Sequence, residues 1–315
     1  MKIGLDVMGG DYAPDATIDG AILALNELPQ SDRIVFFGDQ DIITGKLAEK
    51  GVKPDCFDIV HAPDVIGMAE PPIKAYTQKP KSSIVVGFDY LKNNKIDTFA
   101  SAGNSGAMII GSLYSVKAID GITRPCTSVA FPNENGGKTI LLDIGTNPDP
   151  KPDILYQFGI LGYIYAKHVY KIDNPRVGLL NIGEEEEKGN MLMQSAYKLM
   201  KDSKDFNFIG NIEGRDILKT KADVIVCDGF TGNVVLKQIE AMHKLLSDRG
   251  LMDDYIEQLN FKHHGGTPIL GINASVVVGH GISNDSAIKN MILLSKNIHE
   301  SRLSTKIKDA FTKYA

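Results

Sequence analysis

The stretch Ser101-Ala102-Gly103-Asn104-Ser105-Gly106-Ala107 lies between two apolar runs and decides the fold that the sequence predicts. The run before it is typical of a buried strand, and the run after it of a helix. Its two glycines let the backbone approach a ligand closely, and Asn104 or Ser105 can cap the helix start. Free N–H groups and the helix dipole favour a bound anion there. The alternative is an ordinary strand-to-helix connection with the same cap chemistry.

Alternating elements of the same kind continue along the chain. Strands are predicted at residues 2–7, 33–37, 57–61, 96–100, 124–131, 138–144, 176–182, 206–209, 222–227 and 275–278. Helices are predicted at residues 14–28, 39–50, 83–93, 105–117, 153–170, 191–202, 229–247, 253–259 and 283–299, the last of which ends the fold. The proline-rich segment 62–81 is predicted to be a long irregular excursion, and 133–137 to join a hairpin. This alternation predicts an α/β protein with a mostly parallel sheet covered on both faces.

Composition excludes several classes of protein. The chain has 315 residues, 43% of them hydrophobic and 23% charged, which is typical of a globular domain. A net charge of −5 argues against nucleic-acid binding. The three cysteines are far apart, no signal peptide is evident, and no apolar run approaches the roughly 20 residues that span a bilayer. We expect a cytoplasmic protein of one domain, residues 1–315, without disulfides.

Polar residues and glycines gather where predicted strands end. These turns are 101–107, 143–147, 183–190, 210–216, 228–233 and 279–281. Ligands bind beyond the carboxyl ends of parallel strands, so the turns predict one site. Lys188 and Arg215 are cations that could meet an anion, and His280 could contact a ligand or be satisfied by its own loop.

Several chemistries find no support in the sequence. Asp6 and Asp11 follow the first strand, but nothing supplies the further oxygen ligands of a metal site. The acidic run 184–187 is typical of a solvated loop. There is no GxSxG elbow, catalytic cysteine signature, Walker lysine or GxGxxG turn. The sequence therefore predicts binding of a phosphate or carbonyl group and oxyanion stabilisation, without metal or cofactor.

Ordered motifs over nearly the whole chain closely resemble the PlsX family of bacterial phosphate acyltransferases. They are Leu5–Asp11, Ser101–Ala107, Asn181–Glu184, Lys188–Asn190, Gly210–Asp216, Asp228–Val234, Gly265–Gly271 and Gly279–Gly281. The resemblance implies a three-layer α/β/α fold of two intertwined halves, like isocitrate and isopropylmalate dehydrogenases and phosphotransacetylases. It also implies transfer of a fatty acyl group from acyl-acyl carrier protein to inorganic phosphate. The acyl phosphate product would pass to a membrane glycerol 3-phosphate acyltransferase.

Roles are assigned as a hypothesis to positions that match these motifs. Phosphate is placed on the Gly103–Gly106 turn with help from Lys188 or Arg215. Asn233, Asn147 or backbone N–H groups would stabilise the oxyanion, and His280 is a candidate proton donor. Asp143 and Asp228 are expected to orient their neighbours. The other expected binding residues are Asn104, Ser105, Gly145, Asn211, Gly229 and Gly232.

The resemblance also implies a homodimer, and it has three departures. Thr146 stands where the family usually has alanine, and Ala274 where glycine is frequent. The 235–264 region is shorter than in many relatives, so peripheral membrane association is only weakly expected. Three other functions stay open: a phosphotransacylase that uses acyl-coenzyme A, a decarboxylating hydroxyacid dehydrogenase, and a non-catalytic acyl- or phosphate-binding regulator.

Overall fold

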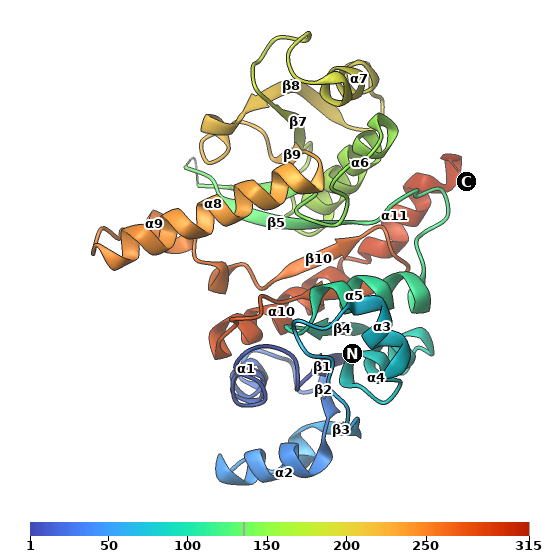
Figure 1. Ribbon diagram of the computed structural model, residues 1–315, viewed down its shortest axis with the longest axis vertical. Helices are drawn as coiled ribbons and strands as arrows, with labels where there is room; N and C mark the ends of the chain where they lie inside the picture. The colour runs from blue at the N-terminus through green and yellow to red at the C-terminus, as the bar shows by residue number, and fades with distance from the viewer. Residues whose placement is uncertain (135, 315) are drawn as a thin grey trace. The chain divides into compact units, whose positions relative to one another are not determined.

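The computed structural model describes residues 1–134 and 136–314, with Asn135 of the predicted hairpin connection outside this set. The chain forms two compact units (Figure 1). Unit 1 contains Met1–Ala118 and Phe261–Ser304, and unit 2 contains Ile119–Asn260 and Thr305–Ala315. Each unit therefore takes two separate stretches of sequence, so the chain passes between the units more than once.

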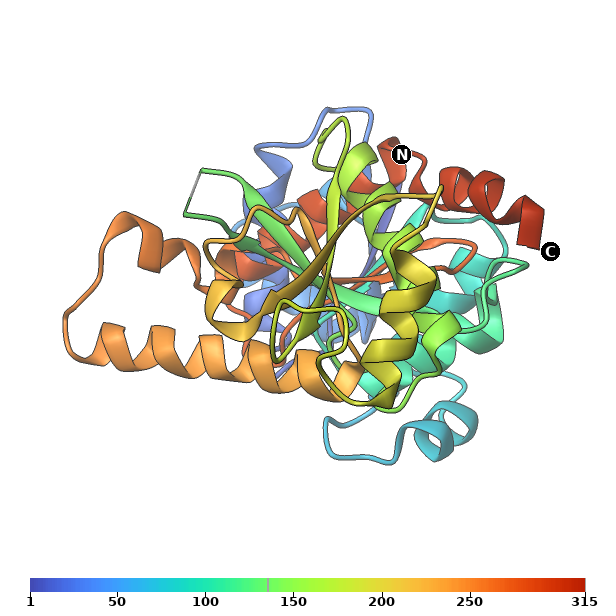
Figure 2. The ribbon, with the colours of Figure 1, turned by 90° about the horizontal axis from the view of Figure 1, so that it is seen from above.

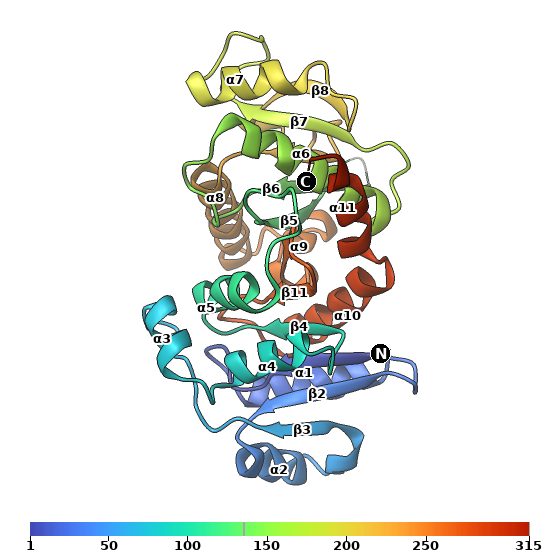
Figure 3. The ribbon, with the colours of Figure 1, turned by 90° about the vertical axis from the view of Figure 1, so that its right-hand side faces the viewer.

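Unit 1 has a sheet in which all strands but one are parallel. In sheet order its strands are β3 (Asp58–His61), β2 (Arg33–Gly38), β1 (Lys2–Asp6), β4 (Thr98–Ser101), β11 (Ser275–Val278) and the antiparallel β10 (Thr267–Leu270). Its helices are α1 (Asp15–Leu25), α2 (Gln40–Glu49), α3 (Pro72–Gln78), α4 (Ser83–Lys92), α5 (Ser105–Gly111) and α10 (Asp285–Glu300). Figure 3 shows β3, β2, β1 and β4 following one another, and in Figure 1 helices α1 and α4 lie on opposite faces of these strands.

The strands of unit 1 form because their apolar side chains fill a continuous core between sheet and helices. Ile3, Leu5, Phe36, Phe37 and Phe99 are fully buried. Near-continuous apolar runs are typical of parallel strands covered on both faces, as the sequence predicted. Ala274, the departure from the family pattern, is partly buried and packs against this core.

Unit 2 repeats the arrangement with different connections. Its strands, in sheet order, are β5 (Cys126–Pro132), β6 (Lys138–Leu142), β9 (Val224–Val226), β7 (Arg176–Asn181) and β8 (Asn207–Glu213). Its helices are α6 (Pro152–His168), α7 (Met191–Met200), α8 (Gly229–Asp248), α9 (Asp254–Gln258) and α11 (Leu303–Phe311). The β5–β6 pair is the predicted antiparallel hairpin, and β6, β9, β7 and β8 are parallel to one another. Figure 2 shows α8 (orange) as one unbroken helix followed by the loop to α9.

The structure corrects the predicted elements at four places. The excursion 62–81 contains the helix α3, which begins with a proline at its first position, where the missing N–H is harmless. Strand β10 was not predicted because it is short and contains Pro268. Strand β8 continues past Ile209, since Gly210 at φ +99° accommodates an extra residue as a bulge. Helix α11 follows the predicted last helix.

The described helices include none that combines the length and apolar character required to cross a bilayer.

Candidate functional site

In unit 1 the carboxyl ends of β1, β4 and β11 share one edge because these strands are parallel. Asp6 ends β1 and is 1% exposed. Its Oδ2 accepts a hydrogen bond of 2.6 Å from the Ser101 hydroxyl, which in turn accepts one of 2.9 Å from the Gly103 N–H. Burial raises the pKa of Asp6, although the hydrogen bond from Ser101 partly offsets that effect. From the sequence Asp6 was considered only as a metal ligand, whereas its contact with Ser101 makes it the support of the glycine turn.

Asn104 has a structural role in this turn. Its Oδ1 accepts a hydrogen bond from the Ala107 N–H and so caps α5 as predicted. Its Nδ2 donates to the carbonyl oxygens of Gly67 and Glu70, both at 3.0 Å, and of Met68 at 3.3 Å. The amide therefore fastens the 62–81 segment to the turn. Both N–H bonds of the amide are thus used within the protein, and a contact between Asn104 and phosphate stays a prediction.

The turn still offers two backbone donors and a hydroxyl. Ser105 and Gly106 are the first two residues of α5. The N–H groups at these positions have no hydrogen-bond partner within the helix. The Ser105 side chain is exposed. A Cβ on Gly106 would lie 2.8 Å from Cγ of Pro72, so this glycine permits close packing of α3. The part of the turn that can meet an anion is Ser105 and the adjoining amides.

His280 lies directly after β11, at the same edge of the unit 1 sheet. It is half-buried, and its carbonyl accepts a hydrogen bond from the Ser283 N–H. The next residue, Gly281, accepts a hydrogen bond of 2.8 Å from the Asp11 N–H. The loop that carries His280 is thereby joined to the loop after β1.

In unit 2 the equivalent edge is organised around Asp143, which is fully buried after β6. Its Oδ1 accepts hydrogen bonds from the N–H and hydroxyl of Thr127 and the N–H of Thr146, at 2.9–3.3 Å. Its Oδ2 accepts from the N–H and Nδ2 of Asn147 at 2.6 and 2.9 Å. Both oxygens are occupied by hydrogen bonds from Thr127, Thr146 and Asn147.

Thr146, where the family usually has alanine, adds to this network. Its hydroxyl lies 2.9 Å from the Thr127 hydroxyl, which itself donates to Asp143. Thr127 was missed by the sequence analysis because it lies inside a predicted strand, away from any glycine turn. Only the pairing of β5 with β6 brings it to the Asp143 carboxylate.

Two glycines at the start of α8 are required by the same network. A Cβ on Gly232 would lie 1.9 Å from the carbonyl oxygen of Asp143, and one on Gly229 would lie 2.8 Å from its Oδ2. Asp228 caps α8, with its carboxylate accepting hydrogen bonds from the Thr231 N–H and hydroxyl at 2.8 and 2.7 Å. These glycines are therefore packing positions, and Asp228 orients the first turn of α8.

The two asparagines proposed for the oxyanion differ. Asn147 is 4% exposed, and its Nδ2 donates to Asp143 Oδ2 and, at 2.9 Å, to the Pro125 carbonyl. Its amide NH₂ is thus hydrogen-bonded within the protein, and the oxyanion role of Asn147 stays a prediction. Asn233 is exposed on α8 and donates one hydrogen bond of 3.2 Å to the Ile144 carbonyl, beside Gly145 at φ +143°. Asn233 keeps an N–H for a ligand.

Lys188 is a cation of this edge and directly follows the acidic run 184–187. It is exposed, and it has no ion pair within the described residues. Its stem lies against Gly183, where a Cβ would meet Lys188 Cγ at 2.9 Å. Asn181 fixes the loop by donating to the Lys188 carbonyl at 3.1 Å, and Gly189 at φ +88° leaves room for that amide. The ammonium group therefore sits on an ordered loop.

Arg215 differs from Lys188 because carboxylates surround it. Its guanidinium contacts Glu213 and lies 3.7 Å from Asp216, and the side chain is 74% exposed. Asn211 donates a hydrogen bond of 2.8 Å to the Glu185 carbonyl, so its amide holds the acidic loop. Arg215 is therefore paired with carboxylates and the Asn211 amide is bonded to the backbone, and their contacts with phosphate stay predictions.

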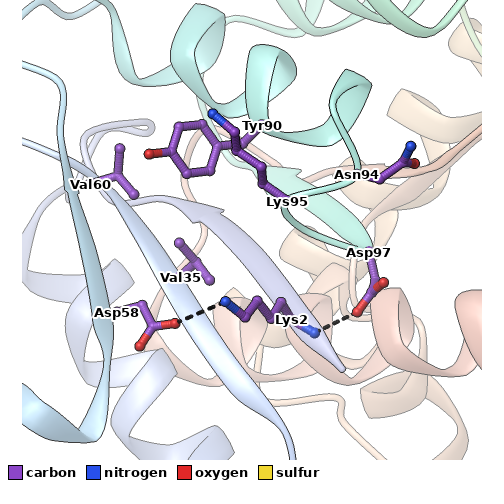
Figure 4. A pocket seen from close by; sticks show the side chains of 8 residues that line it. All are labelled: Lys2, Val35, Asp58, Val60, Tyr90, Asn94, Lys95 and Asp97. Carbon is purple, nitrogen blue, oxygen red and sulfur yellow. Dashed lines mark hydrogen bonds and ion pairs between the residues drawn. The ribbon is translucent and has the colours of Figure 1, made fainter.

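A cavity of about 460 Å³ lies at the opposite strand ends of unit 1 (Figure 4). It is lined by Lys2, Val35, Asp58, Val60, Tyr90, Asn94, Lys95 and Asp97. Its charges are satisfied locally, since the Lys2 ammonium lies 3.8 Å from Asp58 and the Lys2 N–H donates to Asp97 at 2.6 Å. This cavity has no glycine turn and none of the predicted site residues.

Neither buried cysteine is suited to covalent chemistry. Burial raises the pKa of the Cys126 and Cys227 thiols well above the ordinary value. A thiol held protonated is a poor nucleophile. The edges of both units thus offer donors and cations for an anion and an oxyanion, without an evident enzyme nucleophile.

Comparison with known proteins agrees with this chemistry. Residues 1–257 match the model of a family described as "Fatty acid synthesis protein". The chain is 40% identical to a phosphate acyltransferase of Halothermothrix orenii over 99% of both chains, and 39% identical to one of Salinibacter ruber over 98% and 97%. The chain belongs to the phosphate acyltransferase (PlsX) family. It is accordingly an acyltransferase enzyme of fatty acid and phospholipid synthesis.

The fold implied by the PlsX resemblance is also confirmed. A phosphotransacetylase from Streptococcus pyogenes has a TM-score of 0.66 at 16% identity, covering 95% of this chain and 94% of its own. At that identity the likeness concerns the fold alone. The protein thus has the three-layer α/β/α fold of phosphotransacetylases.

Proposed function

We propose that the protein transfers a fatty acyl group from acyl-acyl carrier protein to inorganic phosphate, giving acyl phosphate for phosphatidic acid synthesis. The observation that carries the proposal is the full-length similarity to phosphate acyltransferases. The loop chemistry supports it, because phosphate can attack a thioester directly and needs only to be held and oriented.

The reaction balances without a covalent enzyme intermediate. A phosphate oxygen bonds to the thioester carbonyl carbon, and the tetrahedral intermediate then expels the thiolate as the carbon–sulfur bond breaks. A thiol with a pKa of about 8.5 leaves with little protonation, so one modest acid is sufficient. The main demand on the enzyme is stabilisation of the oxyanion by preorganised donors.

The proposed phosphate contacts in unit 1 are the backbone N–H groups of Ser105 and Gly106 and the Ser105 hydroxyl. They support this role because Asn104 and Ser101, which fix the turn, are ordered by their own hydrogen bonds. Lys188 is proposed to neutralise phosphate charge, Asn233 to donate to the oxyanion, and His280 to supply the proton. Each of these three roles can be tested separately, by substituting Lys188, Asn233 or His280.

The experiment that tests the function supplies phosphate with one acyl chain on two carriers. Purified protein is incubated with hexadecanoyl-acyl carrier protein or hexadecanoyl-coenzyme A, and acyl phosphate is trapped with hydroxylamine. Faster turnover of the carrier-protein thioester is expected. Faster turnover of the coenzyme A thioester would instead assign a phosphotransacylase, and no acyl phosphate from either donor would reject both functions.

We also propose a homodimer that hands acyl phosphate to a membrane glycerol 3-phosphate acyltransferase, with peripheral attachment at the inner face of the membrane. Helix α8 supports a self-association surface because Val234, Met242 and Leu245 are each about half exposed, at 53%, 46% and 46%. Sedimentation velocity checks the dimer, and flotation with anionic vesicles checks the attachment. A monomer at micromolar concentration would reject the first proposal.

A further inference from the structure

Three exposed apolar side chains stand at the edge of unit 1 where the glycine turn lies. Tyr12 is 57% exposed, and Met68 and Ile282 are each 45% exposed. They come from three loops that are far apart in sequence: the loop after β1, the 62–81 segment and the loop after β11. We call these three residues the apolar rim.

A hydrogen bond and a side-chain contact hold the three loops together. The Asp11 N–H donates to the Gly281 carbonyl at 2.8 Å, which places Tyr12 and Ile282 on neighbouring loops. The terminal methyl of Met68 lies against Gly281, where a Cβ would approach it to 2.8 Å. The apolar rim is therefore one surface built from three loops.

The apolar rim is also joined to the glycine turn. The Met68 carbonyl accepts a hydrogen bond of 3.3 Å from Asn104, the residue that caps α5 before Ser105. A Cβ on Gly10 would lie 3.4 Å from Cβ of Ala102, so the loop of Tyr12 packs on the turn as well. Single exposed apolar residues are ordinary on a surface, but three from distant segments beside one polar turn indicate a ligand surface.

We propose that the apolar rim receives the acyl chain of the substrate and sets the preference for chain length. The inference rests on the proposed function, in which the turn beside the rim holds the attacking phosphate. The acyl carbon attacked by phosphate held at Ser105 has its hydrocarbon chain attached, and that chain is stabilised by apolar surface close to the turn. Met68 is the central residue, because its side chain lies against Gly281 and its carbonyl oxygen accepts a hydrogen bond from Asn104.

The test compares kcat/KM for hexadecanoyl and butanoyl thioesters on the same carrier, for the wild type and for Met68→Ser and Ile282→Ser. The hexadecanoyl to butanoyl ratio is expected to fall about tenfold in Met68→Ser. Each methylene group of the acyl chain that is removed from water is expected to raise kcat/KM about fourfold, which corresponds to about 0.8 kcal/mol. Ile42→Ser is the matched control, since Ile42 is 43% exposed on α2, and its ratio is expected to stay at the wild-type value.

The other outcomes separate the two proposals. A wild-type ratio in both rim variants, or an equal loss for both chain lengths, would overturn the role of the rim while leaving acyl transfer intact. Loss of self-association in sedimentation velocity with an unchanged ratio would assign the rim to a contact with a second copy. A wild type that forms no acyl phosphate from either chain length would reject the proposed function itself.

Discussion

Replacing Asp143 with asparagine isolates the hydrogen-bond network that organises the unit 2 edge. The carboxylate is fully buried and accepts five hydrogen bonds, from Thr127, Thr146 and Asn147. An asparagine has the same shape but offers one oxygen and one NH₂ group. Whichever position the NH₂ takes, it faces N–H donors.

The less damaging orientation puts the new NH₂ in place of Oδ2. It then faces the N–H and Nδ2 of Asn147, which in the wild type donate to Oδ2 at 2.6 and 2.9 Å. Hydrogen bonds to a charged group contribute about 1.5–3 kcal/mol each, so two lost bonds amount to roughly 3–6 kcal/mol. Removing a buried charge recovers part of this, and we expect the free energy of unfolding to fall by about 3 kcal/mol.

The assay is urea unfolding followed by circular dichroism, with the free-energy change obtained from the shift of the midpoint at constant slope. Asp149→Asn is the matched control, because Asp149 lies exposed in the same loop and should change stability by less than about 0.5 kcal/mol. A loss below about 1 kcal/mol in Asp143→Asn would refute the reasoning, since it would mean that the five hydrogen bonds add nothing beyond their desolvation.

Three further outcomes are expected. Gly232→Ala should destabilise the protein by about 3 kcal/mol, because its Cβ would overlap the Asp143 carbonyl oxygen, whereas Gly45→Ala in open space on α2 should stabilise it by about 0.5–1 kcal/mol in the same urea assay. Ser105→Ala should raise the KM for phosphate about tenfold and Ser105→Thr should restore it, and an unchanged KM in the alanine variant would remove the hydroxyl from the site. Burial alone would raise the pKa of Asp205, but hydrogen bonds from Lys313, Tyr314 and Tyr156 lower it overall. A lowered pKa stabilises the fold above the unfolded value of about 3.9 and ceases to do so as pH falls through the folded value. The urea midpoint of Asp205→Asn should therefore be below wild type at pH 7 and converge with it below about pH 4, and a difference independent of pH would contradict the assignment.

The sequence predicted most elements of both units because most strands are compact apolar runs and many helices begin with a side-chain cap. Asp39, Ser82 and Asn190 cap helices at the predicted places, each through its own side chain. The failures have local causes. Strand β10 was not predicted because it contains Pro268. Gly210 indicated a turn, but strand β8 continues through it with a bulge.

For the candidate site, the sequence predicts polar residues at strand ends, and their roles in catalysis and binding stay predictions. Sequence places Asn104, Asn147 and Asn211 in polar turns, where an amide can serve a ligand or the backbone. Only the pairing of distant segments shows that all three amides donate to protein oxygens. Thr127 and the carbonyl partners of Asn104 in the 62–81 segment carry no signal in the sequence, since their contacts depend on tertiary packing.

Hydrogen bonds within the protein reduce the number of donors that the glycine turn has left for a phosphate ligand. Gly103 donates its N–H to Ser101, and Asn104 uses its side chain to cap α5 and hold the 62–81 segment. A donor already bonded to protein gains little by exchanging that partner for a ligand. The first-turn N–H groups of Ser105 and Gly106 have no such partner within the helix, and they point along its dipole toward negative charge. The polar side chains of the turn therefore fix its shape, and we propose that its backbone N–H groups and the Ser105 hydroxyl are the groups that bind phosphate.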